Sequence, residues 1–175
     1  VLDRPRPQQL PAHRHGAAIL AARGDMALAS NVESDCAGLG HLMEAVLTAA
    51  PGVRAARDAT RGGMASALNE IARSAGCGIC IDEAGLPLRP EVKGTCEILG
   101  LDPLYLANEG TLVLFVPEAE AEAALAAMRS VPEGRAACRI GQAVAAHPGL
   151  VTMETVFGGM RVIDMLVGEQ LPRIC

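Results

Sequence analysis

The stretch Asp58-Ala-Thr-Arg-Gly-Gly63 is predicted to be the loop that joins a strand over 53–57 to a helix that begins at residue 64. That helix has one apolar face, and Gly76 is a typical residue to end it. The apolar face consists of Met64, Leu68 and Ile71. A strand that passes through a Gly-Gly turn into a helix is a common unit of domains in which helices pack on sheets. The stretch therefore indicates a layered domain of mixed helices and strands.

Further helices and strands alternate around this unit. Ser34 and Asp35 are good N-cap residues for a helix whose apolar residues span 39–47 and which Pro51-Gly52 ends. Residues 111–116 (Thr-Leu-Val-Leu-Phe-Val) form a continuous apolar run that is typical of a buried strand. The other predicted helices lie at 16–23, 90–99 and 117–128, and the other strands at 77–82, 138–144, 150–156 and 160–165. This order predicts a layered α/β or α+β domain.

Composition limits the class of protein. The 175 residues are enough for one ordinary domain, and 50% hydrophobic with 20% charged residues is typical of a packed globular core. A net charge of -5, a single lysine and 2% aromatic residues argue against a nucleic-acid-binding protein. No apolar run approaches the roughly 20 residues that span a bilayer, and residues 1–11 lack the apolar region of a secretory signal. We therefore expect a cytoplasmic protein whose cysteines are reduced thiols.

Cys77-Gly-Ile-Cys80 matches the C-x-x-C pattern of thiol-redox and zinc proteins. A redox pair needs a helix N-terminus to lower the thiol pKa, whereas this pair follows a predicted helix and begins a strand. A zinc site needs further ligands, and the four histidines show no matching spacing. We expect a structural role for the two cysteines and no metal site; a thiol-redox or metal protein is the alternative from another class.

The loop 58–63 and the Asn108-Glu109-Gly110 segment are the two internal candidate sites. Exposed N–H groups at the start of a helix suit a phosphate, and Arg61 can add a bidentate contact. No Gly-Lys-Ser/Thr follows, so the loop is not a Walker loop, and an ordinary turn explains the same residues. Glu109 precedes the most apolar strand, where burial raises a carboxyl pKa and favours a general base. A solvated turn residue is the alternative.

The chain ends in Cys175, after Leu-Pro-Arg-Ile. Residues 167–175 have no periodicity and are predicted to form a tail. Nine extended residues reach at most about 30 Å, at about 3.3–3.6 Å each. Such a reach suits a swinging arm that carries the thiol between sites. A frayed end that happens to finish in cysteine is the alternative.

Four blocks of the sequence resemble the HypE family of NiFe-hydrogenase maturation proteins in order and spacing. The blocks are Glu33-Ser-Asp-Cys36, Asp58-Ala-Thr-Arg-Gly-Gly63 with Leu68-Asn-Glu70, Leu101-Asp-Pro-Leu-Tyr-Leu-Ala-Asn-Glu-Gly110, and Gly168-Glu-Gln-Leu-Pro-Arg-Ile-Cys175. The resemblance covers roughly residues 15–175, and the Pro-Arg-Ile-Cys ending is its specific part. The Thr-Arg-Gly-Gly block is shared more loosely across the aminoimidazole ribonucleotide synthetase (PurM-like) superfamily. The sequence departs from the family at His13-Arg14-His15-Gly16, where Gly-Asp-His-Gly is usual.

The resemblance implies an α+β fold, specifically an αβα-layered PurM-like C-terminal domain with partial likeness to a ferredoxin-like fold. It divides the chain into a leader that does not match (1–12), the domain itself (13–166) and a mobile tail that carries the acceptor cysteine (167–175). The family's N-terminal half, which holds the main ATP-binding residues and most of the dimer interface, has no counterpart in the sequence. The isolated chain is therefore expected to be inactive.

The resemblance also implies the chemistry of an ATP-dependent carbamoyl dehydratase. The carbamoyltransferase HypF would place a carbamoyl group on Cys175, and ATP with Mg would activate its oxygen. Loss of the amide protons and of phosphate would leave a thiocyanate, whose cyano group would pass to iron held by the HypC–HypD complex. Glu109 matches the family's catalytic glutamate. The nucleotide-facing cleft would include Asp58, Thr60, Arg61, Gly62 and Gly63.

The full-length protein would be a homodimer with no nucleic-acid or membrane partner. Three alternatives stand beside this interpretation: another PurM-like ATP-using enzyme, the thiol-redox or metal protein built on Cys77 and Cys80, and a non-catalytic carrier domain. Other PurM-like enzymes, such as thiamine-monophosphate kinase or selenophosphate synthetase, lack the terminal Pro-Arg-Ile-Cys. That ending therefore favours the dehydratase.

Overall fold

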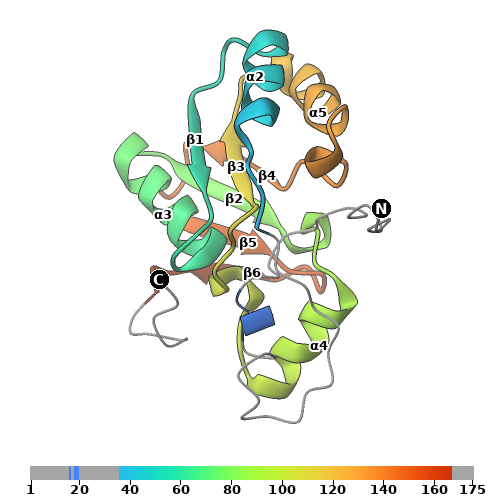
Figure 1. Ribbon diagram of the computed structural model, residues 1–175. Helices are drawn as coiled ribbons and strands as arrows, with labels where there is room; N and C mark the ends of the chain where they lie inside the picture. The colour runs from blue at the N-terminus through green and yellow to red at the C-terminus, as the bar shows by residue number, and fades with distance from the viewer. Residues whose placement is uncertain (1–15, 17, 20–35, 167–175) are drawn as a thin grey trace, which may run out of the picture.

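The computed structural model describes residues 16, 18, 19 and 36–166, and Figure 1 traces the chain. The leader 1–12, most of the predicted helix over 16–23, the predicted caps Ser34 and Asp35, and the tail with Cys175 lie outside the described residues. All the other predicted helices and strands are present. Among the described residues, no helix has both the length and the apolar character that crossing a membrane requires.

The observed helices match those predicted from the apolar periodicity of the sequence, except at the start of α2. Within 36–166 they are α2 (Gly40–Ala49), α3 (Gly63–Ala75), α4 (Pro90–Leu99) and α5 (Ala121–Arg129), with 3₁₀ turns η1 (Glu83–Gly85), η2 (Pro103–Tyr105), η3 (Glu118–Glu120) and η4 (Pro132–Gly134). Gly76 ends α3 as predicted, in the left-handed conformation. The predicted N-caps of α2 are wrong, because residues 36–39 are not helical and Leu39 occupies the cap position without a side-chain hydrogen bond.

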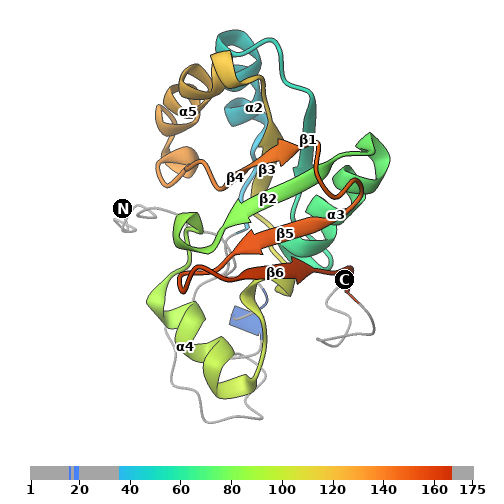
Figure 2. The same ribbon diagram turned by 180° about the vertical axis from the view of Figure 1, so that it is seen from behind.

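Two sheets organise the fold (Figure 2). β1 (Ala55–Asp58) and β3 (Leu112–Phe115) form an antiparallel pair. The second sheet has the order β4-β2-β5-β6, with β2 and β5 parallel and the other neighbours antiparallel. Its strands are β2 (Gly78–Asp82), β4 (Gly141–Val144), β5 (Val151–Glu154) and β6 (Met160–Ile163).

The likeness to a ferredoxin-like fold is confined to part of the chain. The order β1-α3-β2 followed by β3-α5-β4 repeats the β-α-β-β-α-β pattern of that fold. However, β2 and β4 pair with each other in the second sheet and do not flank the β1–β3 pair. The arrangement is therefore α+β with helices on both sides of β1–β3.

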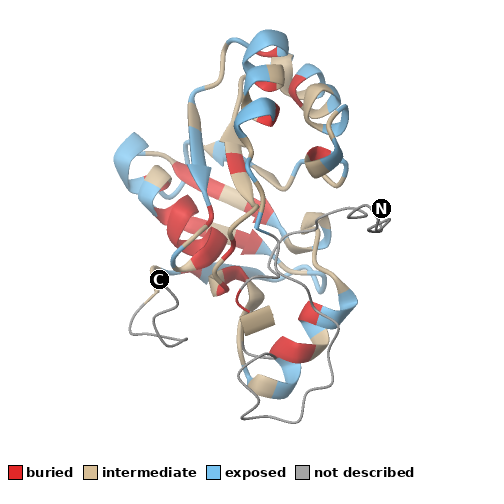
Figure 3. Cartoon of the chain, in the orientation of Figure 1, coloured by how far each residue is buried: buried red, intermediate tan, exposed pale blue. Residues whose placement is uncertain are grey.

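β3 separates two apolar cores because neighbouring residues of a strand face opposite sides. Val113 packs into the main core, which α3 forms with β2, β5 and β6. Leu112 and Leu114 pack on the other side, against α2 and α5. Figure 3 shows the buried residues gathered on α3 and the adjacent strands, with separate groups on α4 and between α2 and α5. Met64, at the start of α3, and Val113, near the start of β3, belong to the same core.

Candidate functional site

The loop 58–63 and the segment that carries Glu109 lie side by side at one end of the β1–β3 pair. Asp58 is the last residue of β1, and its partner Leu112 is the first residue of β3. Beyond this pair, the N–H of Ala59 donates to the carbonyl oxygen of Thr111 at 3.0 Å. The antiparallel register therefore brings together two candidate segments that are far apart in the sequence.

Asn108 fastens these two segments to each other. Its backbone N–H donates to the carbonyl oxygen of Ala59 at 3.1 Å, and its Nδ2 donates to the same oxygen at 3.2 Å and to that of Leu106 at 2.9 Å. The Asn108 side chain is fully buried, where an unpaired amide would be costly. These bonds fix the backbone directly before the half-buried Glu109. The sequence motif singled out Glu109 but did not reveal the contact of Asn108 with Ala59.

The two glycines of the loop are needed for close packing within the protein. Gly62 and Gly63 have φ values of 71° and 62°, in the left-handed region that favours glycine. A Cβ on Gly63 would stand 2.4 Å from the carbonyl oxygen of Leu104 and 2.5 Å from that of Leu106. The N-terminal end of α3 therefore rests directly on the backbone of the segment that leads to Glu109.

The last described residues of the chain reach the same place. A Cβ built on Gly62 would be 3.8 Å from the Cβ of Leu166. Just before it, the carbonyl oxygen of Asp164 accepts a hydrogen bond of 2.8 Å from the hydroxyl of Tyr105. The structure thus brings together the loop 58–63, the Glu109 segment and residues 164–166, whereas Cys175 lies outside the described residues.

The exposed part of the loop offers groups that suit an anion. Arg61 is exposed and Thr60 is half-buried, so a cation and a hydroxyl lie just before the N-terminal end of α3. Asp58 is exposed beside them. The N–H of Gly63 already donates to the carbonyl oxygen of Thr60 at 3.1 Å. No group of three or more His, Cys, Asp or Glu side chains within the described part of the chain is arranged to hold a metal ion.

The cysteines elsewhere in the fold lack the geometry of a redox pair. Cys77 follows Gly76 at the C-terminal end of α3, and Cys80 lies within β2. Three residues of extended chain span about 10 Å, beyond the roughly 7 Å that a disulfide bridges between Cα atoms. Burial is the main cause that raises the pKa of the Cys96 thiol to about 11, and burial also raises the pKa of Cys138. Raised thiol pKa values disfavour the reactive thiolate.

An apolar cavity of about 720 Å³ lies next to the segment that follows Glu109. Its walls come mainly from β3, α5, β2 and the segment 136–143. Neither the side chains of the loop 58–63 nor Glu109 line it, although Gly110 and Thr111 do. The cavity therefore borders the candidate site without including the side chains of the loop 58–63 or of Glu109.

Residues 10–153 match the family described as AIR synthase related protein, C-terminal domain. The carbamoyl dehydratase HypE of Rhodobacter capsulatus is 74% identical over 161 residues, which are 92% of this chain and 47% of that protein. HypE of Cupriavidus necator is 52% identical over 92% of this chain and 46% of its own length. The chain therefore spans about half the length of these relatives.

Solved structures of HypE have the same fold. A crystal structure of hydrogenase maturation protein HypE matches with a TM-score of 0.88 and 45% identity, over 94% of this chain and 53% of that chain. A structure of HypE in complex with ATP matches with a TM-score of 0.87 and 44% identity, over 94% of this chain and 50% of that chain. A HypE–HypF complex matches with a TM-score of 0.83 and 38% identity, over 91% of this chain and 51% of that chain. The predicted PurM-like α+β fold is confirmed. The chain belongs to the family formed by the C-terminal domains of AIR synthase related proteins, and the relatives named above are HypE proteins.

Proposed function

We propose that this chain is the C-terminal half of an ATP-dependent carbamoyl dehydratase that converts a carboxamide on the Cys175 thiol to a thiocyanate. The observation that carries the proposal is the meeting of three segments at one end of β1–β3. These are the loop 58–63, the segment of Glu109, and residues 164–166, which lead into the tail. The relatives named carbamoyl dehydratase HypE support the type of reaction.

In the proposed reaction, the Sγ of Cys175 carries the group –C(=O)NH₂. When bound, ATP supplies the phosphoryl group that turns the amide oxygen into a phosphate leaving group. One amide proton leaves as the oxygen takes the phosphoryl group, and the second leaves as the C–O bond breaks. The electron pair of that N–H bond completes the C≡N bond. The sulfur substituent thereby loses the elements of one water, while ATP becomes ADP and phosphate.

Glu109 is the proposed base that accepts a proton from the amide nitrogen. A general base must lie within hydrogen-bond reach of its proton, and the buried Asn108 fixes the backbone on which Glu109 is placed. The chain after Leu166 starts beside Gly62, at the same end of the domain. A tail of nine residues with a reach of about 30 Å is long enough to return its terminal thiol to this end.

The loop 58–63 is the proposed nucleotide-facing edge of this half. Arg61 and Thr60 would contact a phosphate group through charge-assisted and hydroxyl hydrogen bonds, with Asp58 and the Gly62-Gly63 turn beside them. A relative is known in complex with ATP. The described residues hold no group of three or more His, Cys, Asp or Glu side chains that could form a metal site without a ligand's own oxygens. We propose that Mg and most of the ATP contacts belong mainly to the other half of the enzyme.

The proposed partners follow from the chemistry of the thiol. HypF would load Cys175, in line with the solved HypE–HypF complex of a relative. Iron held by HypC–HypD would accept the cyano group: the iron would supply the electron pair of the new Fe–C bond, and the C–S bond would break with its own pair going to sulfur, so that Cys175 leaves as a thiolate. The full-length enzyme would act as a homodimer in the cytoplasm. The isolated chain would be inactive, because the residues that hold Mg and most of ATP lie in the other half.

The test is Glu109→Gln in the full-length enzyme. Glutamine keeps the shape and hydrogen bonding of the side chain but does not accept the proton, so the variant should be loaded by HypF and then stall. Mass spectrometry after addition of ATP should find the carboxamide on Cys175 and, within the assay, no form lighter by one water. Loss of a general base slows a reaction by about 10²–10⁴-fold.

Two controls accompany this test. Glu44→Gln replaces an exposed glutamate on α2, remote from the site, and should form thiocyanate at the wild-type rate. Cys175→Ala should carry neither adduct. Thiocyanate formation by Glu109→Gln at the wild-type rate would show that Glu109 is a turn residue and that the base lies elsewhere.

A further inference from the structure

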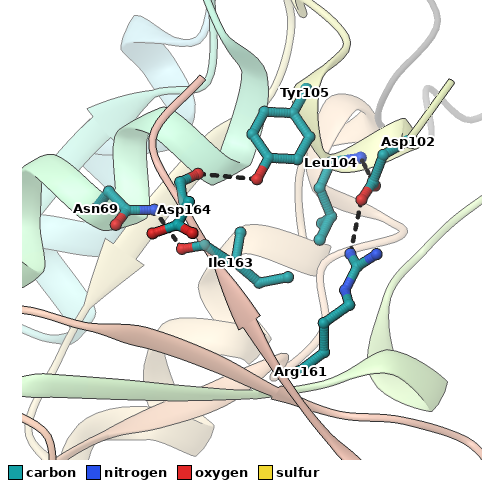
Figure 4. A network of polar contacts seen from close by, with 7 residues as sticks. All are labelled: Asn69, Asp102, Leu104, Tyr105, Arg161, Ile163 and Asp164. Atoms are coloured by element: carbon teal, nitrogen blue, oxygen red, sulfur yellow. Dashed lines mark hydrogen bonds and ion pairs between the residues drawn. The ribbon is translucent and has the colours of Figure 1, made fainter. Parts of the chain in front are cut away.

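The end of β6 is held by side chains from two other elements (Figure 4). Asn69 of α3 donates from Nδ2 to the carbonyl oxygen of Ile163, the last residue of β6, at 2.9 Å. Tyr105 of η2 donates from its hydroxyl to the next carbonyl oxygen, that of Asp164, at 2.8 Å. Two successive carbonyls are therefore fixed at the point where the chain leaves the sheet.

Asp102 ties η2 to the same strand. Its Oδ1 accepts from the N–H of Leu104 at 2.9 Å, which caps the 3₁₀ turn, and its Oδ2 accepts from Arg161 of β6 at 2.7 Å. The carboxylate thus orients η2, and Tyr105 with it, over β6. We call the four side chains of Asn69, Asp102, Tyr105 and Arg161 the β6 anchor.

The β6 anchor also holds a residue that lies outside the hydrogen-bonded strand pair. The ladder between β5 and β6 ends at the pair of Val151 with Ile163, so Asp164 lies outside it. The Tyr105 hydroxyl donates the bond to the Asp164 carbonyl, and burial and the negative charge of Asp102 raise its pKa further above neutral pH. Two residues after Asp164, Leu166 lies beside Gly62. Tyr105 is thus the side chain that holds the first residue after the sheet.

We propose that Tyr105 is a positioning residue for the reaction at Cys175, which it serves by fixing where the tail begins. The proposal rests on the proposed function. A tethered group reacts at an effective concentration set by the length of its tether and by where the tether starts. Tyr105 also lies four residues before Glu109 in one segment, which Asn108 holds against Ala59. One segment would therefore set both the origin of the tail and the place of the base.

The test is Tyr105→Phe in the full-length enzyme, with loading by HypF and ATP-dependent dehydration measured separately in single turnovers. Phenylalanine keeps the ring, which packs against the main core, and removes the hydroxyl. Loading should be unchanged, since the partner brings its own site to the thiol. Dehydration should be slower by about 3- to 10-fold, the range that corresponds to the loss of one hydrogen bond. Ser130→Ala, which removes a 2.7 Å hydroxyl-to-carbonyl bond at the end of α5, should leave both rates unchanged.

Two measurements distinguish positioning from a general loss of stability. Amide hydrogen exchange in Tyr105→Phe should speed up in the peptide over 160–166 and remain unchanged in α2 and α5. Replacement of Tyr105 by 4-aminophenylalanine, whose ring amine donates a hydrogen bond, should restore the dehydration rate.

Three results would overturn the proposal: a wild-type dehydration rate in Tyr105→Phe, an equal fall in loading and dehydration with faster exchange throughout the chain, or no recovery with 4-aminophenylalanine. The first leaves the proposed function intact, since the wild-type enzyme still forms thiocyanate. If the wild-type enzyme itself forms none, the proposed function fails, and the inference about Tyr105 fails with it.

Discussion

Replacing Gly63 by alanine should weaken the contact between α3 and the segment that leads to Glu109. Gly63 has φ of 62°, and its Cα faces the carbonyl oxygens of Leu104 and Leu106. The new methyl carbon would stand 2.4 and 2.5 Å from these backbone atoms, so one of the two segments must move. The substitution therefore perturbs the site without removing any polar group.

The expected loss of stability has two parts. A non-glycine residue in the left-handed region costs about 1–2 kcal/mol. Forcing a methyl group into a filled space costs about 1–3 kcal/mol more, because backbone atoms do not yield as a flexible side chain does. Gly63→Ala should therefore lower the free energy of unfolding by about 2–5 kcal/mol.

Gly76→Ala is the matched control. Gly76 has the same φ of 62°, but a Cβ built there has nothing within 4 Å. This variant should lose only the conformational part, about 1–2 kcal/mol. The assay is urea denaturation of the two variants and the wild-type chain, followed by circular dichroism.

The difference between the two variants isolates the contact of Gly63 with Leu104 and Leu106. Equal losses would mean that the close approach carries no energy and that α3 and the 104–106 segment adjust freely. In that case the rigid placement of Glu109 relative to the loop 58–63 would lose its support.

Two further predictions concern the cysteines. Burial raises the pKa of Cys96 from 9.0 to about 11, so the unfolded thiol ionises first and stability is lost as pH rises from 9 to 11, by at most about 2–3 kcal/mol. Denaturation across this range should show that Cys96→Ala loses less stability than the wild-type chain, and parallel curves would contradict the assignment. Replacing both Cys77 and Cys80 by serine or valine should leave cyanide formation by the full-length enzyme largely intact, and an inactive but folded variant would point to a functional pair.

Local patterns predicted most of the elements but none of the long-range pairing. The apolar face of α3 and the run over 111–116 indicate a helix and a strand directly, because both signals lie within a few residues. The pairing of β2 with β4 and β5 joins residues that are far apart in the chain. It is made by backbone N–H and C=O groups, which are the same in almost every residue, so the local sequence does not indicate which strands pair. The expected caps Ser34 and Asp35 of α2 were wrong, since a good capping residue occurs in many loops that start no helix.

The sequence names the candidate residues, but it does not predict the contacts that bring them together. Glycines, a cation of the type that suits a phosphate, and an acidic residue before a buried strand are visible in the sequence, so it indicates the loop 58–63 and Glu109 as candidates. The contacts that join them depend on Asn108, whose side chain meets Ala59 only in the folded chain. Tyr105 lies in a block that resembles the family, but its role as a donor could not be read from the sequence, because its partner is a backbone carbonyl far along the chain.

The parallel pairing of β2 with β5 also determines when the tail acquires a fixed origin during folding. Ile79 must meet Val151 across α4, β3, α5 and β4, and such non-local contacts form slowly. β6 pairs only with β5, so the hydrogen bond between Tyr105 and Asp164 has to await that closure. In a chain synthesised from its N-terminus, β6 and residues 164–166 are therefore the last described part that can pack.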